Sequence, residues 1–232
     1  SLFIFKIKAN CIKIKNKMSK LNYSLILVVL LLSFSVGKSM AQGSRYSGSY
    51  VKSNTIKYSG KSNFTIEGVE ILGNGVHAIE LSNCENVVIK NSKLSSTNSP
   101  SRMGIYLYNC RNVTIEDCTF DNVRSALVAS TSTGVKFEHN DVKNVVGTLY
   151  TSGDTGSMVQ FIKVSGANNS ISYNACENFS GVSYPEDLVN IYASNGTANS
   201  PIMIKGNWIR GGGPSISGGG INLGDYGGSY QV

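Results

Sequence analysis

The part of the chain from residue 42 to residue 232 lacks a net charge, although the whole sequence carries a formal charge of +7. Seven of the 21 Lys and Arg residues lie in the first 41 positions, where there is no Asp or Glu. The remainder holds 14 basic and 14 acidic residues. Affinity for nucleic-acid phosphates depends on clustered positive charge, so the sequence predicts no nucleic-acid partner.

Motifs for zinc and for nucleotides are also missing. The five cysteines form no CxxC pair and have no Cys/His spacing of a zinc site. The glycine runs 211–213 and 218–220 do not join a strand to a helix and are not followed by the lysine of a phosphate-binding loop. We therefore expect neither a metal–thiolate centre nor a nucleotide site.

Helical periodicity is absent as well, and a short strand-like repeat takes its place. Residues 84–94 read CENVVIKNSKL and residues 110–120 read CRNVTIEDCTF, which match almost position for position. Three apolar positions of this unit recur along the chain, as Phe64, Ile66 and Ile71; Val87, Ile89 and Leu94; Val113, Ile115 and Phe120; Val135, Phe137 and Val142; Ile171, Tyr173 and Phe179; and Ile202, Ile204 and Ile209. An apolar residue at every second position predicts a strand.

A second series of short strands lies between these units, beginning with Ile79 and Leu81 and continuing with Ile105 and Leu107. The second apolar positions of successive units are 23, 26, 22, 36 and 31 residues apart, with Gly, Asn, Asp and Ser at the turns. Repeats of this length without helices predict an all-β fold, a right-handed parallel β-helix (β-solenoid) of about six to seven coils.

On this repeat the chain resembles the pectin-lyase-like superfamily of right-handed parallel β-helix proteins over residues 63–232. The resemblance implies a bacterial, secreted protein that acts on polysaccharides. Its enzymes are lyases or epimerases of uronate polymers, and the lyases use a Lys or Arg base assisted by Ca²⁺. The motifs typical of its members are absent here, namely the Asn-Thr-Asp and Gly-His-Gly of polygalacturonases, the Asp-Pro-His-Asp of mannuronan epimerases and the Arg-x-Pro-x-x-Arg of pectate lyases.

The N-terminal part has the order of regions found in a secretory signal peptide: a lysine, an apolar block at 25–34 and small residues before Gln42. An uncleaved N-terminal anchor is the alternative. Either way we expect a secreted, periplasmic or cell-surface protein, with no membrane span after signal removal. The predicted organisation is upstream, non-native translation over 1–17, a signal peptide over 18–41, an N-terminal cap or linker over 42–62, and a β-helix over 63–232 that is a fragment truncated at its C-terminus.

A candidate sugar-binding stripe follows from the alternation in the second strand series. If Ile79, Leu81 and their equivalents point inward, the alternate residues point outward and stack coil upon coil. They are Glu80, Ser82, Tyr106, Tyr108, Val128, Ser130, Lys163, Ser165, Asn190, Tyr192, Asn222 and Gly224. Aromatic faces cover sugar rings, and amides pair with hydroxyls. We expect a polysaccharide to bind at Tyr106, Tyr108, Asn190, Tyr192 and Asn222; an ordinary solvated sheet face is the alternative.

Chemistry, if present, should lie beside this stripe, where long loops lead into the strands. Lys163, Asp187 and Arg210 are the candidate catalytic residues of a lyase or epimerase acting on an acidic, uronate-containing polysaccharide. Glu186 and Asp187 could bind Ca²⁺, take part in proton transfer or form a solvated loop tip. The alternative to an enzyme is a non-catalytic glycan- or protein-binding surface module or adhesin.

Two further groups of residues are assigned to structure. Cys84 and Cys110 occupy equal positions in adjacent repeats, where they could form a disulfide or remain as thiols in an interior stack. The polar pairs after the first strand of each repeat are expected to make turns and a ladder of stacked amides. These pairs are Asn91-Ser92, Asp117-Cys118, His139-Asn140 and Gly206-Asn207.

Overall fold

The computed structural model describes residues 46–73, 75–96, 103–147, 156–212 and 218–232. Within these ranges all regular elements are β-strands, β1 to β21. No helix in the described ranges is long and apolar enough to cross a membrane. The predicted signal peptide and the segment before it lie outside the described residues.

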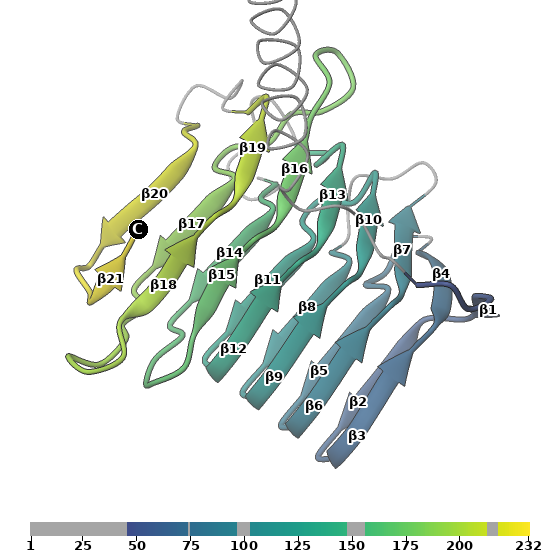
Figure 1. Cartoon of the computed structure of the whole chain (residues 1–232), viewed down its shortest axis with the longest axis horizontal. Coiled ribbons are helices and arrows are strands. Elements are labelled where there is room, and N and C mark those ends of the chain that lie inside the picture. The colour runs from purple at the N-terminus through teal and green to yellow at the C-terminus, as the bar shows by residue number, and fades with distance from the viewer. Residues whose placement is uncertain (1–45, 74, 97–102, 148–155, 213–217) are drawn as a thin grey trace, which may run out of the picture. The chain divides into compact units, whose positions relative to one another are not determined.

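The 21 strands form three parallel sheets of seven strands, because each coil gives one strand to each sheet and every strand pairs with the third strand after it (Figure 1). Sheet A contains β1 (Val51–Ser53), β4 (Val69–Gly73), β7 (Lys93–Ser96), β10 (Thr119–Asp121), β13 (Asp141–Lys143), β16 (Ala175–Glu177) and β19 (Trp208–Arg210). Sheet B contains β2 (Ile56–Ser59), β5 (Ile79–Ser82), β8 (Ile105–Tyr108), β11 (Leu127–Ser130), β14 (Val159–Ile162), β17 (Val189–Tyr192) and β20 (Ile221–Asp225). Sheet C contains β3 (Ser62–Glu67), β6 (Glu85–Lys90), β9 (Arg111–Glu116), β12 (Thr133–Glu138), β15 (Ser170–Ser172), β18 (Ile202–Lys205) and β21 (Tyr230–Gln231). The predicted parallel β-helix is confirmed, with seven coils.

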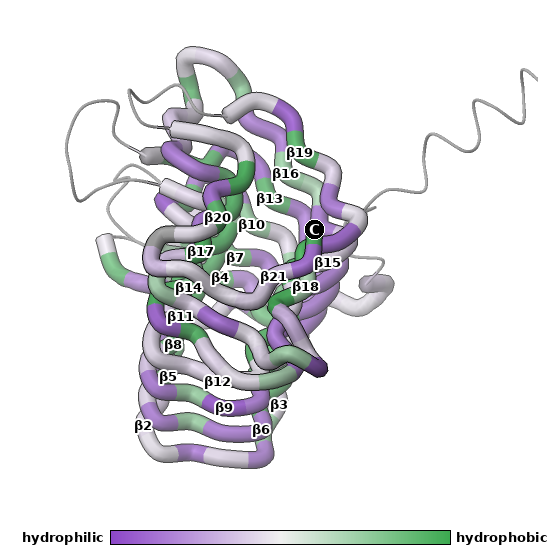
Figure 2. Tube along the Cα trace, turned by 90° about the vertical axis from the view of Figure 1, so that its left-hand side faces the viewer, coloured by the Kyte–Doolittle hydropathy of each residue, from purple (hydrophilic) through white to green (hydrophobic). Residues whose placement is uncertain are grey.

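The core is built from files of apolar side chains that stack between coils. Ile89, Ile115 and Phe137 share one register in sheet C, as predicted, and each is fully buried. The outward residues of β9 are polar, so hydrophobic and hydrophilic positions alternate along this strand (Figure 2). Strands of this kind gain stability because each apolar residue touches its equivalents in the coils above and below.

The corner from sheet C to sheet A carries the predicted amide ladder. Asn91, Asp117 and His139 turn the chain with positive φ angles of 49–57°, which Asn and Asp tolerate better than most residues. The next residue of the later coils is an Asn, buried at 140 and 174 and half-buried at 207. The Asn140 backbone N–H donates to Asn174 Oδ1 over 2.9 Å, and the Asn174 N–H donates to Asn207 Oδ1 over 3.1 Å. These side chains therefore satisfy backbone groups that a sharp corner would otherwise leave unpaired.

Two boundaries differ from the sequence prediction. The solenoid begins upstream of residue 63, since β1 and β2 already pair with β4 and β5. In the fifth repeat Ile171 stacks with Phe137 and Ile204, whereas the predicted members Tyr173 and Phe179 are exposed. Cys176 takes the place assigned to Phe179. A long loop before this repeat shifted the apparent unit, so the alternation was aligned to the wrong residues.

Charged residues at equal register in neighbouring coils mostly have opposite signs. On the outside of sheet A, Lys143 lies between Asp121 and Glu177, and Glu177 forms an ion pair with Arg210 at 2.9 Å. Opposite charges directly across a strand pair favour that alignment. Sheet C holds an exception among its described strands, where Glu116 is paired with Glu138.

The four cysteines of the described chain are buried thiols. Cys84 Sγ donates to the Ser82 carbonyl and Cys110 Sγ donates to the Tyr108 carbonyl, each over 3.4 Å. Of the two alternatives for this pair, the structure has the interior thiols. Burial raises the pKa of Cys118 to about 12.

Candidate functional site

The outer side of sheet B presents the predicted stripe, here called the sheet B face. It consists of the outward residues of β8, β11, β14 and β17 together with Asn222 of β20. These are Tyr106, Tyr108, Val128, Ser130, Gln160, Ile162, Asn190, Tyr192 and Asn222. The five predicted binding residues Tyr106, Tyr108, Asn190, Tyr192 and Asn222 have this outward register, and their role in binding stays a prediction. Val128 is buried in spite of its outward register.

Aromatic rings mark both ends of this face. Tyr108 is 47% exposed, and Tyr192 meets the ring of Tyr226 edge to face with 5.4 Å between centroids. Tyr106 stacks on the imidazole of His77 at 5.0 Å, with 15° between the ring planes. Burial raises the pKa of Tyr106, and the nearby Tyr108 and Glu80 raise it further. Neither His77 nor Tyr226 lies in a strand alternation, so the sequence pattern gives no signal that they contact this face.

Lys163 does not lie on the sheet B face, so its predicted position was wrong. The alternation had been read with Ile162 inward, but Phe161 is the buried residue of β14 and Ile162 points outward. Gln160 consequently takes the position beside Asn190. The consecutive apolar residues gave two possible registers, and a one-residue shift exchanges the two faces of a strand.

Lys163 instead occupies the corner between sheets B and C. Its φ of 55° matches those of Asn83, Asn109 and Thr131, which hold the same corner in earlier coils with values of 51–53°. Lys163 is exposed, and its backbone N–H donates to the Tyr192 carbonyl over 3.0 Å. It therefore continues a structural column of left-handed residues.

Asp187 does lie beside the face, as part of a buried clamp rather than as a free carboxylate. Its Oδ1 accepts the Gly219 N–H over 2.8 Å. Its Oδ2 accepts from Asn190 Nδ2 over 2.8 Å and from Asn222 Nδ2 over 3.2 Å. The side chain is 4% exposed. Asp187 thus joins the last two coils of sheet B and fixes the orientation of two predicted binding residues.

The clamp leaves one acceptor unused. The Nδ2 group of Asn190 donates a hydrogen bond to Asp187, so the Oδ1 of the same amide does not face Asp187. That oxygen is enclosed and has no hydrogen-bond donor. An enclosed acceptor without a donor is unfavourable. The structure gives no donor to this oxygen within the described residues.

The predicted Ca²⁺ site does not fit the residues present. Both oxygens of Asp187 accept from N–H groups, whereas Ca²⁺ requires a shell of oxygen ligands. The Glu186 backbone N–H donates to the Gly156 carbonyl, and the described residues contain no group of three or more His, Cys, Asp or Glu that could hold a metal. We derive no chemistry through Ca²⁺ here.

Arg210 lies on sheet A, away from the other two predicted catalytic residues. It belongs to β19 and pairs with Glu177 of β16. The structure therefore brings Asp187, Asn190 and Asn222 together but does not bring Lys163 or Arg210 to them.

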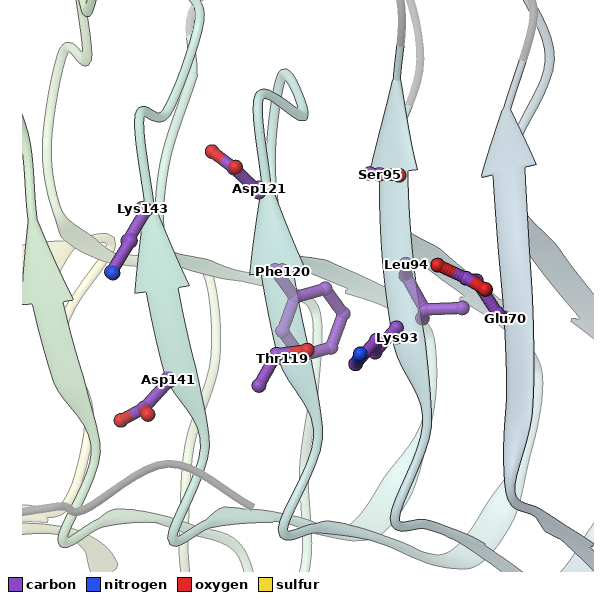
Figure 3. Close-up of a pocket in the computed structure, with 9 residues that line it drawn as sticks. All are labelled: Glu70, Lys93, Leu94, Ser95, Thr119, Phe120, Asp121, Asp141 and Lys143. Atoms are coloured by element: carbon purple, nitrogen blue, oxygen red, sulfur yellow. The ribbon is translucent and has the colours of Figure 1, made fainter. Parts of the chain in front are cut away.

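The outer side of sheet A has a cavity of about 320 Å³ that the sequence argument missed (Figure 3). Polar side chains from four adjacent strands line it, and the buried core residues Leu94 and Phe120 also contribute. The polar lining consists of Glu70, Lys93, Ser95, Thr119, Asp121, Asp141 and Lys143. Burial raises the pKa of Asp141 to about 6, partly offset by Lys143. Oppositely charged residues at alternate positions of a strand are also typical of an ordinary solvated sheet face, so the sequence gives no signal for this cavity.

Comparison with known families agrees with the geometry. The family described as the right-handed beta helix region matches residues 6–161 and 54–232. The chain belongs to this family. No curated protein and no solved structure matched the chain.

Proposed function

We propose that this chain is an exported glycan-binding β-helix module that holds a neutral polysaccharide along the sheet B face. The observation that carries this proposal is a pair of neighbouring outward columns on sheet B, one holding Tyr106, Gln160 and Asn222 and the other holding the exposed Tyr108 and Tyr192. Tyrosine rings cover the apolar faces of sugars, and the amides of Gln160 and Asn222 donate to and accept from hydroxyls, whereas Asn190 is held in the Asp187 clamp. The signal-peptide pattern over residues 18–41 supports export.

The charge of the face favours a neutral ligand over a uronate polymer. None of the described outward residues of β8, β11, β14 and β17 is charged. Lys57 of the first coil is an exposed cation of sheet B, and it is paired with Glu80 at 2.8 Å. A polymer of carboxylates would lose its hydration on this surface without a cation to replace it.

A non-catalytic role is also favoured by the positions of the candidate catalytic residues. Lys163 turns a corner, Asp187 is saturated with hydrogen bonds and Arg210 is on another sheet. General acid–base catalysis needs such groups within hydrogen-bond reach of the same substrate atom. These three residues do not meet that condition together. We therefore propose a binding function for this chain instead of a catalytic one.

The test is affinity electrophoresis of the purified chain in gels that contain a neutral glucan, mannan or xylan, or the acidic polymers alginate and polygalacturonate. We expect retardation by a neutral polymer and no release of unsaturated or shortened products. Retardation only by the acidic polymers, or cleavage of any of them, would favour the lyase or epimerase instead. Migration unchanged by every polymer would contradict glycan binding.

A further inference from the structure

The cavity on sheet A is lined by an acidic group, Asp141, one of whose oxygens has no hydrogen-bond donor. Asp141 lines the cavity from β13, and its Oδ1 is enclosed without a hydrogen-bond donor. Figure 3 shows the Asp141 side chain beside that of Lys143, with Asp121 on the neighbouring strand. A carboxylate without donors is poorly stabilised, which explains why burial raises its pKa. Asp141 as a whole is only partly buried and lines the cavity, so a ligand held there is within reach of its carboxyl group.

Each of the two lysines that line the cavity already lies next to a carboxylate or an aromatic ring. Lys93 Nζ lies 4.2 Å from the centroid of the Tyr50 ring, and its register neighbour is Glu70. Lys143 stands between its register neighbours Asp121 and Glu177. With Asp141 ionised, the lining contains three carboxylates and two ammonium groups. The net charge is negative, which favours a cationic ligand over an anion.

The remaining lining adds hydroxyl groups next to the acid. Thr119 is the register neighbour of both Lys93 and Asp141, and Ser95 is the register neighbour of Asp121. A volume of about 320 Å³ is at the lower end of the range for small-molecule pockets. It suits a single polar ring better than a polymer chain.

From this geometry we propose that the sheet A cavity is a second binding site, separate from the sheet B face, for a hydroxylated primary amine such as an amino sugar. The ammonium group donates to the Asp141 carboxylate. The sugar hydroxyls exchange hydrogen bonds with Thr119 and Ser95. An ammonium–carboxylate contact is a charge-assisted hydrogen bond and is stronger than a neutral one.

This site has a defined dependence on pH. Besides Asp141, the charged group on the same strand is Lys143. The charged groups on the strands around it are Asp121 on β10, Lys93 on β7 and Glu177 on β16. The pKa of Asp141 is about 6, so its carboxylate form is abundant above that pH and scarce below it. Affinity for the amine should fall about tenfold between about pH 7 and about pH 5, because the ionised fraction of Asp141 falls from about nine-tenths one unit above its pKa to about one-tenth one unit below it.

The experiment is a titration of the isotope-labelled chain with glucosamine, followed through the backbone N–H resonances of Thr119 and Asp141. Glucosamine should shift both resonances at about pH 7 and bind about tenfold more weakly at about pH 5. N-acetylglucosamine, which lacks the charge, and glucuronate, which carries the opposite charge, should shift neither. Equal binding of N-acetylglucosamine, binding of glucuronate or no shift with glucosamine would overturn the proposal.

Two variants complete the test. Asp141→Asn removes the charge while keeping the shape, and it should abolish the glucosamine shifts. Asp117→Asn is the matched control, because Asp117 lies at a corner outside the cavity and its equivalent in the preceding coil is Asn91. Glucosamine binding that persists in Asp141→Asn, or that is lost in Asp117→Asn, would refute the role of the cavity.

Discussion

Asn174 and Asn207 are joined by two hydrogen bonds to one atom: both the backbone N–H and the side-chain Nδ2 of Asn174 donate to Asn207 Oδ1, at 3.1 and 2.9 Å. Asn174 Nδ2 also donates to the Phe137 carbonyl at 2.9 Å. One buried side chain thus links three successive coils at a corner, since Asn140 donates back to it. The corner depends on amide chemistry and not on apolar contact alone.

Replacement of Asn174 by Ala should therefore be costly. It leaves the Asn140 N–H and the Phe137 carbonyl without their partners, and we expect a loss of about 3 kcal/mol of unfolding free energy. Denaturant unfolding measures this loss. Asn86→Gly is the control, because Asn86 is an exposed, positive-φ residue of a surface amide pair with Asn63. A loss in Asn174→Ala no greater than in Asn86→Gly would contradict the ladder's role.

The sheet B face predicts a specific pattern of binding losses. Tyr108→Ala and Tyr192→Ala should each weaken retention by a neutral polysaccharide about five- to tenfold, because each removes about 1 kcal/mol of ring contact. Affinity electrophoresis gives the ratio directly. Tyr173→Ala is the matched control, since Tyr173 is a similarly exposed tyrosine at a corner away from the face. Equal losses in all three variants would point to unspecific aromatic binding.

Asp187 and Arg210 should respond differently to mutation. Asp187→Asn places an amide where three N–H groups converge, so we expect a loss of about 2 kcal/mol in stability and weaker glycan retention through Asn222. Arg210→Ala removes an exposed ion pair with Glu177, which is worth less than about 1 kcal/mol. Unfolding curves and gel retention measure both variants. A glycan-binding defect in Arg210→Ala would place sheet A in the glycan site.

The raised pKa of Asp141 gives the fold a dependence on pH. Its folded pKa of about 6 exceeds the ordinary 3.8, so between these values the folded state holds more protons than the unfolded state. Stability should accordingly decrease as the pH rises from about 4 to about 6. Because the side chain is partly exposed, Asp141→Asn should gain only about 1 kcal/mol above pH 6 and nothing below pH 4. Unfolding free energies that differ by the same amount at every pH would contradict this assignment.

The buried thiols should be inert in the folded protein. Burial raises the pKa of Cys118 and of Cys176 to about 12, and both side chains are fully buried. Alkylation requires the thiolate, so mass spectrometry should find neither cysteine labelled at neutral pH until denaturant is added. Labelling without denaturant would show that these coils open readily.

The repeat could be recognised in the sequence because every coil of a solenoid must pack its apolar residues against the equivalent residues of the neighbouring coils. Val113 and Ile115 had to match Val87 and Ile89, since they touch directly across the strand pair. The same logic placed Tyr106 and Asn190 on an outer face. It failed at Lys163, where consecutive apolar residues allowed two registers, and at Tyr173, where a long loop obscured the start of the unit.

The candidate site was harder to predict from the sequence than the fold. It depends on corners and on side-chain directions, which the alternation of apolar and polar residues does not show. Nothing in the local sequence shows that Asp187 turns toward Gly219, which is 32 positions later. The sheet A cavity was missed for another reason. Asp141 and Lys143 look like solvated residues of a strand, and only the stacking of four coils encloses the space between them.

The alternating charges of sheet A limit how this protein can lengthen or shorten in evolution. Loss of the single coil that carries Lys143 would set Asp121 beside Glu177, and duplication of it would set two lysines side by side. Either event exchanges an attraction for a repulsion of comparable size. Removal of two coils at once would preserve the alternation by joining Asp121 to Arg210. Relatives of different length should therefore favour even numbers of turns in this region, by the small energy of an exposed charge pair.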